Sequence, residues 1–363
     1  MIEINKKSDC SGCSACKNIC PRNAISMLDD EKGFKYPSIN HNYCINCGLC
    51  ERACPIINKT IENAELPRAF AANNKNEYIR MQSSSGGMFT LIAENIIKKD
   101  GIVFGAVFND NFLVEHVKVD CVEELFKIRG AKYIQSDINK TYKQAKECLE
   151  KGQHVLFSGT PCQIEGLKSY LMKNYDTLYT QDLICHGVPS KLVWNRYLEY
   201  RKKEDNGKLE SIYFRDKENK GWNKYQLLFK YKEFHKYIDH EDDLYMKLFL
   251  SDIALRDSCY NCNFKKKHRV SDITLADFWG INKILPEIND EKGTSLLIIN
   301  SKKGEDLLEE IKEKLDIQEV EFESAIRGNP SMTKSPKMKE EREKFFEDLN
   351  KLGVEELVYK YLN

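Results

Sequence analysis

Eight cysteines lie within the first 55 residues, in two runs with the same spacing, CxxCxxCxxxCP. Each CxxC step places two thiolates on one tight turn, close enough to share a metal centre. Three thiolates at this spacing surround one side of a cluster, so the fourth ligand must come from elsewhere. The cysteines are Cys10, Cys13, Cys16 and Cys20, followed by Cys44, Cys47, Cys50 and Cys54.

This spacing is typical of two-cluster ferredoxins, in which the fourth cysteine of each run binds the other cluster. The resulting assignment gives one 4Fe–4S cluster to Cys10, Cys13, Cys16 and Cys54, and a second to Cys44, Cys47, Cys50 and Cys20. Structural zinc sites or disulfides are the alternatives. Zinc sites usually combine two separated CxxC pairs, and they need neither the third cysteine step nor the proline that ends each run.

The composition limits which classes of protein this chain can belong to. A chain of 363 residues, 41% hydrophobic and 31% charged, can form two or three folded domains. The net charge of zero gives no electrostatic reason to expect nucleic acid as a partner. The start lacks an apolar signal segment and no run approaches the length of a membrane span, so we expect a cytoplasmic protein. Fourteen cysteines in such a chain indicate metal or redox chemistry rather than disulfides.

The order of apolar segments predicts an α+β ferredoxin-like N-terminal module, then an α/β domain with a mixed sheet and a helical C-terminal tail. The module covers residues 1–58 and a linker follows at 59–67. Alternating strands and helices predict the α/β domain over 68–300, with an antiparallel hairpin inserted at 209–240. Residues 301–363 are charged and predicted to be a helical extension.

Four further cysteines form a second constellation. Cys162 and Cys185 each follow a predicted strand, and the carboxyl ends of parallel strands meet at one rim, where ligands bind. Together with Cys259 and Cys262 they supply enough thiolates for a third 4Fe–4S cluster. The alternative is a zinc site on the CxxC step, with Cys162 and Cys185 as ordinary buried thiols. We interpret Cys121 and Cys148 as structural.

Other residues beside these cysteines have two interpretations each. The serines and glycines of 84–87 precede a predicted helix and form either an anion site suited to a flavin phosphate or a serine N-cap with two turn glycines. His186 either carries protons near the redox centre or is a hydrogen-bonded structural histidine. Arg269 ends a basic run that either binds a phosphate or forms a solvated face. Asp277 and Trp279 end a strand at the rim, where they either contact a cofactor or hold the loop in place.

Six separated motifs then occur in a fixed order after the cysteine runs. They are SSGGMFT, GAKYIQS, GTPCQ, DLICHG, CYNC and DITLADFWG. With the double ferredoxin module, this series resembles the coenzyme F-420 hydrogenase/dehydrogenase β-subunit family, from about residue 5 to about residue 300.

The resemblance implies a flavoprotein that carries three 4Fe–4S clusters and FAD. It makes Ser85, Gly86 and Gly87 the expected FAD contacts, and adds Lys132 and Tyr133, with Arg269 and Asp277 behind them. His186 is the candidate catalytic residue.

The predicted function is that of an iron–sulfur flavoprotein oxidoreductase. Its clusters would exchange electrons with ferredoxin or another redox protein, and its flavin would exchange two electrons with a small organic substrate, coenzyme F-420 or another conjugated acceptor. One alternative is an electron-transfer subunit of a larger redox complex without a small-molecule substrate. Another is a scaffold that senses redox state through its clusters.

Overall fold

A computed structural model describes residues 2–58 and 67–362. The predicted linker at 59–67 therefore lies outside the described residues except for Pro67. In the described part of the chain, no helix combines the length and the apolar character that crossing a membrane requires.

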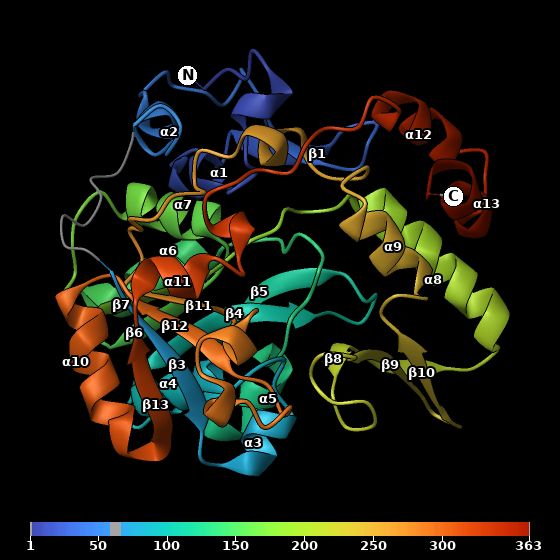
Figure 1. Cartoon of the computed structure of the whole chain (residues 1–363). Helices are drawn as coiled ribbons and strands as arrows, with labels where there is room; N and C mark the ends of the chain where they lie inside the picture. The colour runs from blue at the N-terminus through green and yellow to red at the C-terminus, as the bar shows by residue number, and fades with distance from the viewer. Residues whose placement is uncertain (1, 59–66, 363) are drawn as a thin grey trace.

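The N-terminal module (blue in Figure 1) consists of two short helices and a two-stranded antiparallel sheet. Each helix carries the third cysteine of one run, Cys16 or Cys50, and both cysteines pack with Ile2 and Ile25 in a small apolar core. A core of this size is typical of modules that metal centres help to stabilise. The elements are α1 (Ala15–Ile19), β1 (Ile25–Asp29), β2 (Lys35–Ile39) and α2 (Leu49–Arg52).

Eight of the described strands form one mixed sheet in the order β13-β3-β12-β11-β7-β6-β4-β5. Strands β11, β7, β6 and β4 are parallel, and antiparallel strands extend the sheet on both sides. Their bounds are β3 (Arg68–Asn74), β4 (Ile102–Phe108), β5 (Val114–Val119), β6 (Val155–Ser158), β7 (Leu178–Leu183), β11 (Ile273–Asp277), β12 (Ser295–Ile299) and β13 (Leu315–Val320). Because β13 joins this sheet, the sheet domain extends beyond residue 300, where the sequence places its end.

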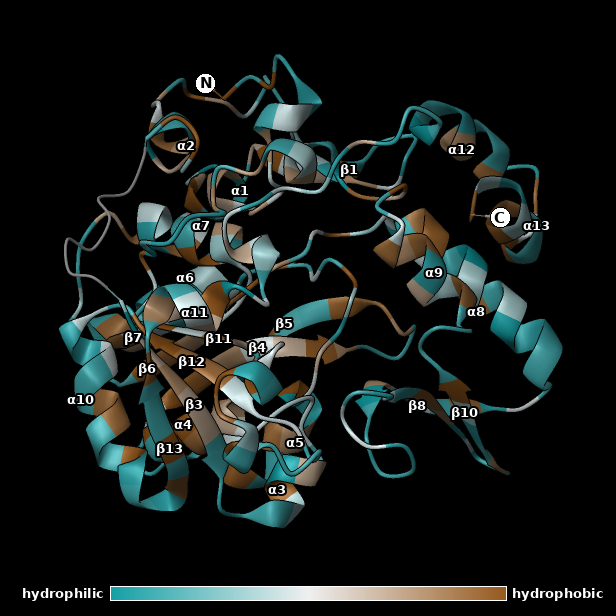
Figure 2. Ribbon diagram, in the orientation of Figure 1, coloured by the Kyte–Doolittle hydropathy of each residue, from teal (hydrophilic) through white to brown (hydrophobic). Residues whose placement is uncertain are grey.

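Helices cover both faces of the sheet (Figure 2). Strands β4, β6 and β12 are accordingly almost continuously apolar, whereas β7 carries the buried polar residues Thr180, Gln181 and Asp182. In β4, Val103 packs toward α4 and α10, whereas Ile102 and Phe104 pack toward α6 and α7. The helices of this domain are α3 (Glu77–Met81), α4 (Met88–Ile97), α5 (Leu125–Ile128), α6 (Thr141–Glu150), α7 (Pro161–Leu171), α10 (Lys302–Ile311) and α11 (Phe322–Ile326).

The insertion is larger than the predicted hairpin. Three antiparallel strands share an aromatic-rich core with two helices that flank them in the chain, α8 and α9, and with the two tail helices, α12 and α13. Trp194 and Tyr245 lie at its centre, with ring centroids 4.7 Å apart. The elements are α8 (Lys191–Asp205), β8 (Leu209–Asp216), β9 (Gln226–Tyr231), β10 (His235–Asp239), α9 (Leu244–Leu250), α12 (Arg342–Leu349) and α13 (Val354–Leu362). The predicted helical tail is thus present, beginning after β13.

Candidate functional site

The first cavity lies in the N-terminal module and has an empty volume of about 360 Å³. Cys10, Cys13, Cys16 and Cys54 all line it, so the wall combines three cysteines of one run with the last cysteine of the other. Burial raises the pKa of the Cys13 thiol to about 12. A metal centre offsets this cost, because the ligand form of cysteine is the thiolate.

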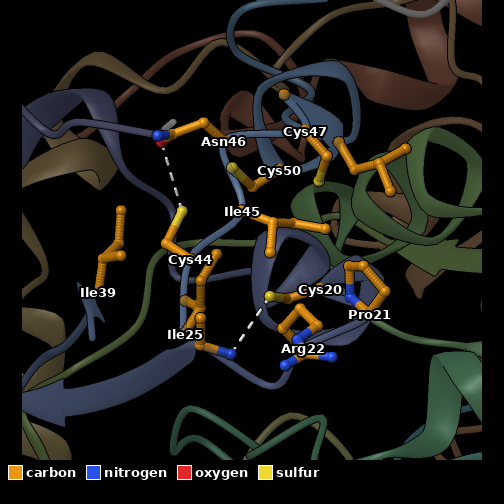
Figure 3. Close-up of a pocket in the computed structure, with 13 residues that line it drawn as sticks. Cys20, Pro21, Arg22, Ile25, Ile39, Cys44, Ile45, Asn46, Cys47 and Cys50 are labelled. Carbon is orange, nitrogen blue, oxygen red and sulfur yellow. Dashed lines mark hydrogen bonds between the residues drawn. The ribbon is translucent and has the colours of Figure 1, made fainter. Parts of the chain in front are cut away.

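The second cavity, of about 390 Å³, mirrors the first (Figure 3). Its wall contains Cys44, Cys47 and Cys50, and Cys20 comes from the other run. The Sγ of Cys20 accepts a hydrogen bond from the backbone N–H of Ala24 at 3.2 Å. Cys47 is exposed, so this site is the more accessible of the two.

The third cavity, of about 570 Å³, is lined by Cys162, Cys185, Cys259 and Cys262. Cys162 lies in the first turn of α7, which begins with a capping box in which the backbone N–H of Thr160 donates to Gln163 at 2.9 Å. Cys185 follows β7, and Cys259 lies on a short 3-10 helix, η3 (Asp257–Asn261). Burial raises the pKa of Cys185 to about 12 and that of Cys259 to about 11.

The chemistry of these three donor sets fits iron–sulfur clusters. Each cavity gathers four thiols, the number of ligands that a 4Fe–4S cluster requires, and Asp9 in the first cavity is the one carboxylate residue in the three walls. Among the described residues, no three His, Cys, Asp or Glu side chains converge as ligands of a single metal ion. A zinc site needs such convergence, whereas a cubane spreads its thiolates over four irons.

A large cavity of about 2140 Å³, including its open mouth, adjoins the third cavity. It lies at the carboxyl ends of β6, β7 and β11, the rim that the sequence indicated. Most of the predicted cofactor contacts line it together with His186. They are Ser85, Gly87, Lys132, Tyr133 and Asp277.

The serine–glycine loop lines this cavity but does not form the serine N-cap that one of the two interpretations predicted. Helix α4 begins at Met88, and its N-cap is Gly87, whose φ of 82° suits glycine. The serines hold the loop to other segments: Ser84 Oγ accepts from the backbone N–H of Ala131 at 2.8 Å, and Ser85 Oγ donates to the carbonyl of Thr294 at 2.8 Å.

Gly86 and Arg269 do not line the large cavity, in contrast to the prediction. Gly86 packs against the sheet, where an added Cβ would lie 2.4 Å from the carbonyl oxygen of Ala72, and its N–H donates to Ser295. Arg269 lines the third cavity instead. It is buried and bonded to Asp182 at 3.1 Å, so it is not part of a solvated face.

Two cations in the cavity wall have no carboxylate within ion-pair distance among the described residues, Arg129 and Lys132. Arg129 Nε donates to Thr90 Oγ1 at 2.9 Å, and Lys132 Nζ donates to the carbonyl of Arg129 at 3.0 Å. Burial lowers the pKa of Lys132 to about 7. Together they favour an anionic ligand beside the N-terminus of α4, where the helix dipole acts in the same sense.

The Asp277 carboxylate is already engaged by the protein. It forms a buried ion pair with Arg215 on β8 at 2.7 Å and accepts a hydrogen bond from Trp222 Nε1 at 3.0 Å. Arg215 also stacks on Tyr225, its Cζ 3.9 Å from the ring centroid. Arg129, Arg215 and Tyr225 also line the cavity and were not predicted from the sequence. No short motif surrounds the last two, which reach the cavity only because the insertion folds against the sheet.

His186 lies in the wall beside Cys185. Its Nε2 is 2.6 Å from Asp252 Oδ1, and its ring packs edge-on against Phe249 with centroids 5.2 Å apart. The carboxylate thus fixes the orientation of the imidazole.

The segment 327–343, here called the C-terminal strap, contacts both the large cavity and the third cysteine set. Ser335 Oγ accepts a hydrogen bond from the backbone N–H of Cys262 at 3.0 Å. Arg342 is buried, donates to the carbonyl of Leu255 at 2.7 Å and pairs with Asp257 on η3. The tail therefore helps to hold the loop that carries Cys259 and Cys262.

Comparison with known proteins agrees with this architecture. Residues 9–56 match the family model described as a 4Fe-4S dicluster domain. The chain is therefore an iron–sulfur protein of an oxidoreductase class. Residues 152–325 match the family model for the C terminus of the coenzyme F420 hydrogenase/dehydrogenase β-subunit. This match, over just under half of the chain, agrees with the resemblance that the series of motifs indicated.

Curated relatives come from methanogenic archaea. One of the subunits of the F(420)H(2) dehydrogenase of Methanosarcina mazei is 27% identical over 179 residues, which cover 45% of this chain and 49% of that protein. Coenzyme F420-dependent sulfite reductase of Methanocaldococcus jannaschii is 25% identical over 198 residues, 54% of this chain and 30% of that protein. The matches thus span half or less of the length of these two relatives.

A solved structure shares the fold. A chain of the F420-reducing [NiFe] hydrogenase complex from Methanosarcina barkeri superimposes with a TM-score of 0.50 and 16% identity, covering 83% of this chain and 95% of that chain. At this identity the likeness supports the fold alone.

Proposed function

We propose that this chain is an iron–sulfur flavoprotein oxidoreductase. It exchanges electrons with a ferredoxin-type protein at its N-terminal module and transfers two electrons to or from an organic substrate in the large cavity. The substrate is a conjugated acceptor, coenzyme F-420 being one candidate, since the names of the two curated relatives refer to it.

The observation that carries this proposal is the continuity of the cavities. The first and third cavities share Ser11 and Ile56 in their walls, and the third and large cavities share Cys162 and Cys185. Centres held in these cavities would form an ordered series from the exposed module to the large cavity. When bound, the clusters supply single-electron transfer and the flavin supplies two-electron exchange with an organic molecule.

The residues of the large cavity have separate tasks in this proposal. Arg129 and Lys132, with Ser85 and Gly87, would bind the phosphates of FAD, because they present cations and loop groups beside a helix N-terminus. Tyr133 and the Arg215–Asp277 pair would shape the rest of the wall. His186 would hold an oriented imidazole toward the reacting part of the substrate.

The size of the large cavity supports an organic ligand. Without its open mouth, the cavity has a volume of about 550 Å³, within the range of roughly 300–1,000 Å³ typical of small-molecule sites. The enclosing protein would also exclude water from the reacting groups.

The test is the iron, sulfide and flavin content of anaerobically purified protein, with its visible spectrum before and after dithionite. We expect about twelve irons and one flavin per chain. The Cys162→Ser variant should lose about four irons and no longer pass electrons between viologen and flavin. Cys148→Ser is the matched control, because Cys148 is buried outside the three cysteine cavities and its loss should leave the iron content unchanged.

Either of two results would contradict the proposal. Full iron content in Cys162→Ser would show an ordinary thiol at this position. Clusters without any flavin after gentle purification would instead support an electron-transfer subunit that docks on a partner enzyme and has no substrate of its own.

A further inference from the structure

Arg256 connects the first and third cysteine sets. Its side chain is fully buried, and its Nε donates to the carbonyl of Cys10, a residue of the first cavity, at 2.8 Å. Its own carbonyl accepts a hydrogen bond from the backbone N–H of Cys259, a residue of the third cavity, at 2.9 Å. The guanidinium is therefore bonded to the first set, and its charge also acts on the Cys259 thiol of the third.

The partners of Arg256 are all neutral. Its Nη2 donates to the carbonyl of Lys35 at 2.9 Å, its Nη1 lies 3.5 Å from Gln135 Oε1, and its Cζ is 4.3 Å from the ring centroid of Tyr36. Among the described residues, no carboxylate lies within ion-pair distance of this side chain. A fully buried cation without a counterion is costly.

The other buried arginines of the described chain avoid this cost. Each of them forms an ion pair with an aspartate. The pairs are Arg80–Asp290, Arg201–Asp205, Arg215–Asp277, Arg269–Asp182 and Arg342–Asp257. Since this fold pairs its buried arginines throughout, the exception at Arg256 indicates a negative charge that the polypeptide itself does not supply.

We propose that Arg256 is a counter-cation shared by the iron–sulfur centres of the first and third cysteine sets, and that it raises their reduction potentials. The inference rests on the proposed function. Four thiolates outweigh the positive charge of an iron–sulfide core, so each centre is a net anion, and reduction adds to its negative charge. A fixed cation at this distance stabilises the reduced form more than the oxidised form, and nearby charge is one of the factors that set cluster potentials.

This role is specific to a positive charge between two centres. Arg256 does not line the large cavity, so it adjusts the reduction potentials of the two centres and takes no part in the reaction with substrate. By stabilising the reduced form of both centres together, it raises both potentials in the same direction.

The experiment is a redox titration of Arg256→Gln and Arg256→Lys, followed by electron paramagnetic resonance, beside the wild-type protein. At a given potential, Arg256→Gln should lower the ratio of reduced to oxidised centres about tenfold or more in two of the three centres, equivalent to about 59 mV for a one-electron couple. Arg256→Lys, which keeps the charge, should stay close to wild type. Arg201→Gln is the matched control: it removes a buried arginine that pairs with Asp205, and it should leave the potentials unchanged.

Wild-type potentials in a fully loaded Arg256→Gln variant would overturn the proposal and leave Arg256 as a structural link. If Arg256→Gln loses iron, the Arg256→Lys variant distinguishes the two roles. Full iron content with wild-type potentials in Arg256→Lys supports the role of the charge, and an equal loss of iron in both variants contradicts it. A wild-type protein with only about eight irons would instead contradict the proposed third centre, before any Arg256 variant is compared.

Discussion

Substitution of Gly166 by alanine tests how closely the N-terminal module packs against α7. A Cβ at this position would lie 2.9 Å from the Cβ of Cys13, 3.0 Å from its Sγ and 3.1 Å from the hydroxyl of Tyr142. Neither neighbour moves easily: Tyr142 is fully buried and donates to the carbonyl of Gln163, and Cys13 precedes Ser14, whose backbone is left-handed.

Two opposing effects set the magnitude. Alanine in a helix interior is favoured over glycine by about 1 kcal/mol. Overpacking a filled site costs about 1–3 kcal/mol, and contacts of 2.9 to 3.1 Å to three rigid atoms place this site toward the upper end. We therefore expect the free energy of unfolding to fall by about 1–2 kcal/mol, with the largest displacement at Cys13.

The assay combines denaturant unfolding with iron content. Gly166→Ala should unfold at lower denaturant and lose up to about four irons, because Cys13 can no longer complete the first cysteine set. Gly304→Ala is the matched control: its Cβ would lie 2.3 Å from the carbonyl oxygen of Asp272, far from any cysteine set in the chain, so it should destabilise with full iron. A Gly166→Ala variant more stable than wild type, with full iron, would refute the packing argument.

Three further predictions concern the large cavity and the strap. Arg129→Gln should weaken flavin binding about tenfold or more, by loss of a charge-assisted contact worth about 1.5–3 kcal/mol, measured by fluorescence of released flavin; unchanged affinity would remove Arg129 from the phosphate site. Because burial lowers the pKa of Lys132 from 10.5 to about 7, the unfolded chain binds the extra proton between these pH values, so the stability of the flavin-free protein should rise with pH across this window. Unfolding curves of Lys132→Met should show a smaller rise, and an identical pH dependence would exclude Lys132 as its source. Ser335→Ala removes the acceptor for the Cys262 N–H and should change the potential or resonance signal of one centre while iron content stays full; spectra identical to wild type would show that the strap does not affect that centre.

Sequence patterns predicted much of the fold because they are local. The apolar runs that became β4, β6 and β12 lie in a sheet whose two faces are both covered by helices, and this burial favours continuous apolar sequence. The same patterns gave the wrong end for the sheet domain. Strand β13 has alternating polar residues, because it lies at the edge of the sheet, and its segment was therefore assigned to the charged tail.

For the candidate site too, the predictions that rest on local spacing differ from those that depend on contacts between distant segments. The eight N-terminal cysteines were paired across the two runs from spacing alone, since steps of two intervening residues fix where thiolates point. The serine N-cap, one of the two interpretations of the loop serines, is wrong, because the contacts of Ser84 with Ala131 and of Ser85 with Thr294 join segments far apart in the chain. Gly86 carries no signal in sequence that separates close packing on a strand from contact with a ligand.

The sequence by itself determined the family resemblance, the two cysteine runs and the strand-and-helix order, because each depends on residues near one another in the chain. Only the tertiary structure decided that Cys162 and Cys185 face one cavity with Cys259 and Cys262, that Arg215 pairs with Asp277, and that Arg256 stands between two cysteine sets without a carboxylate. These relations depend on how sheet, insertion and strap pack together. An unpaired charge is informative only when it is buried, because water would solvate and salt would screen the same arginine on the surface.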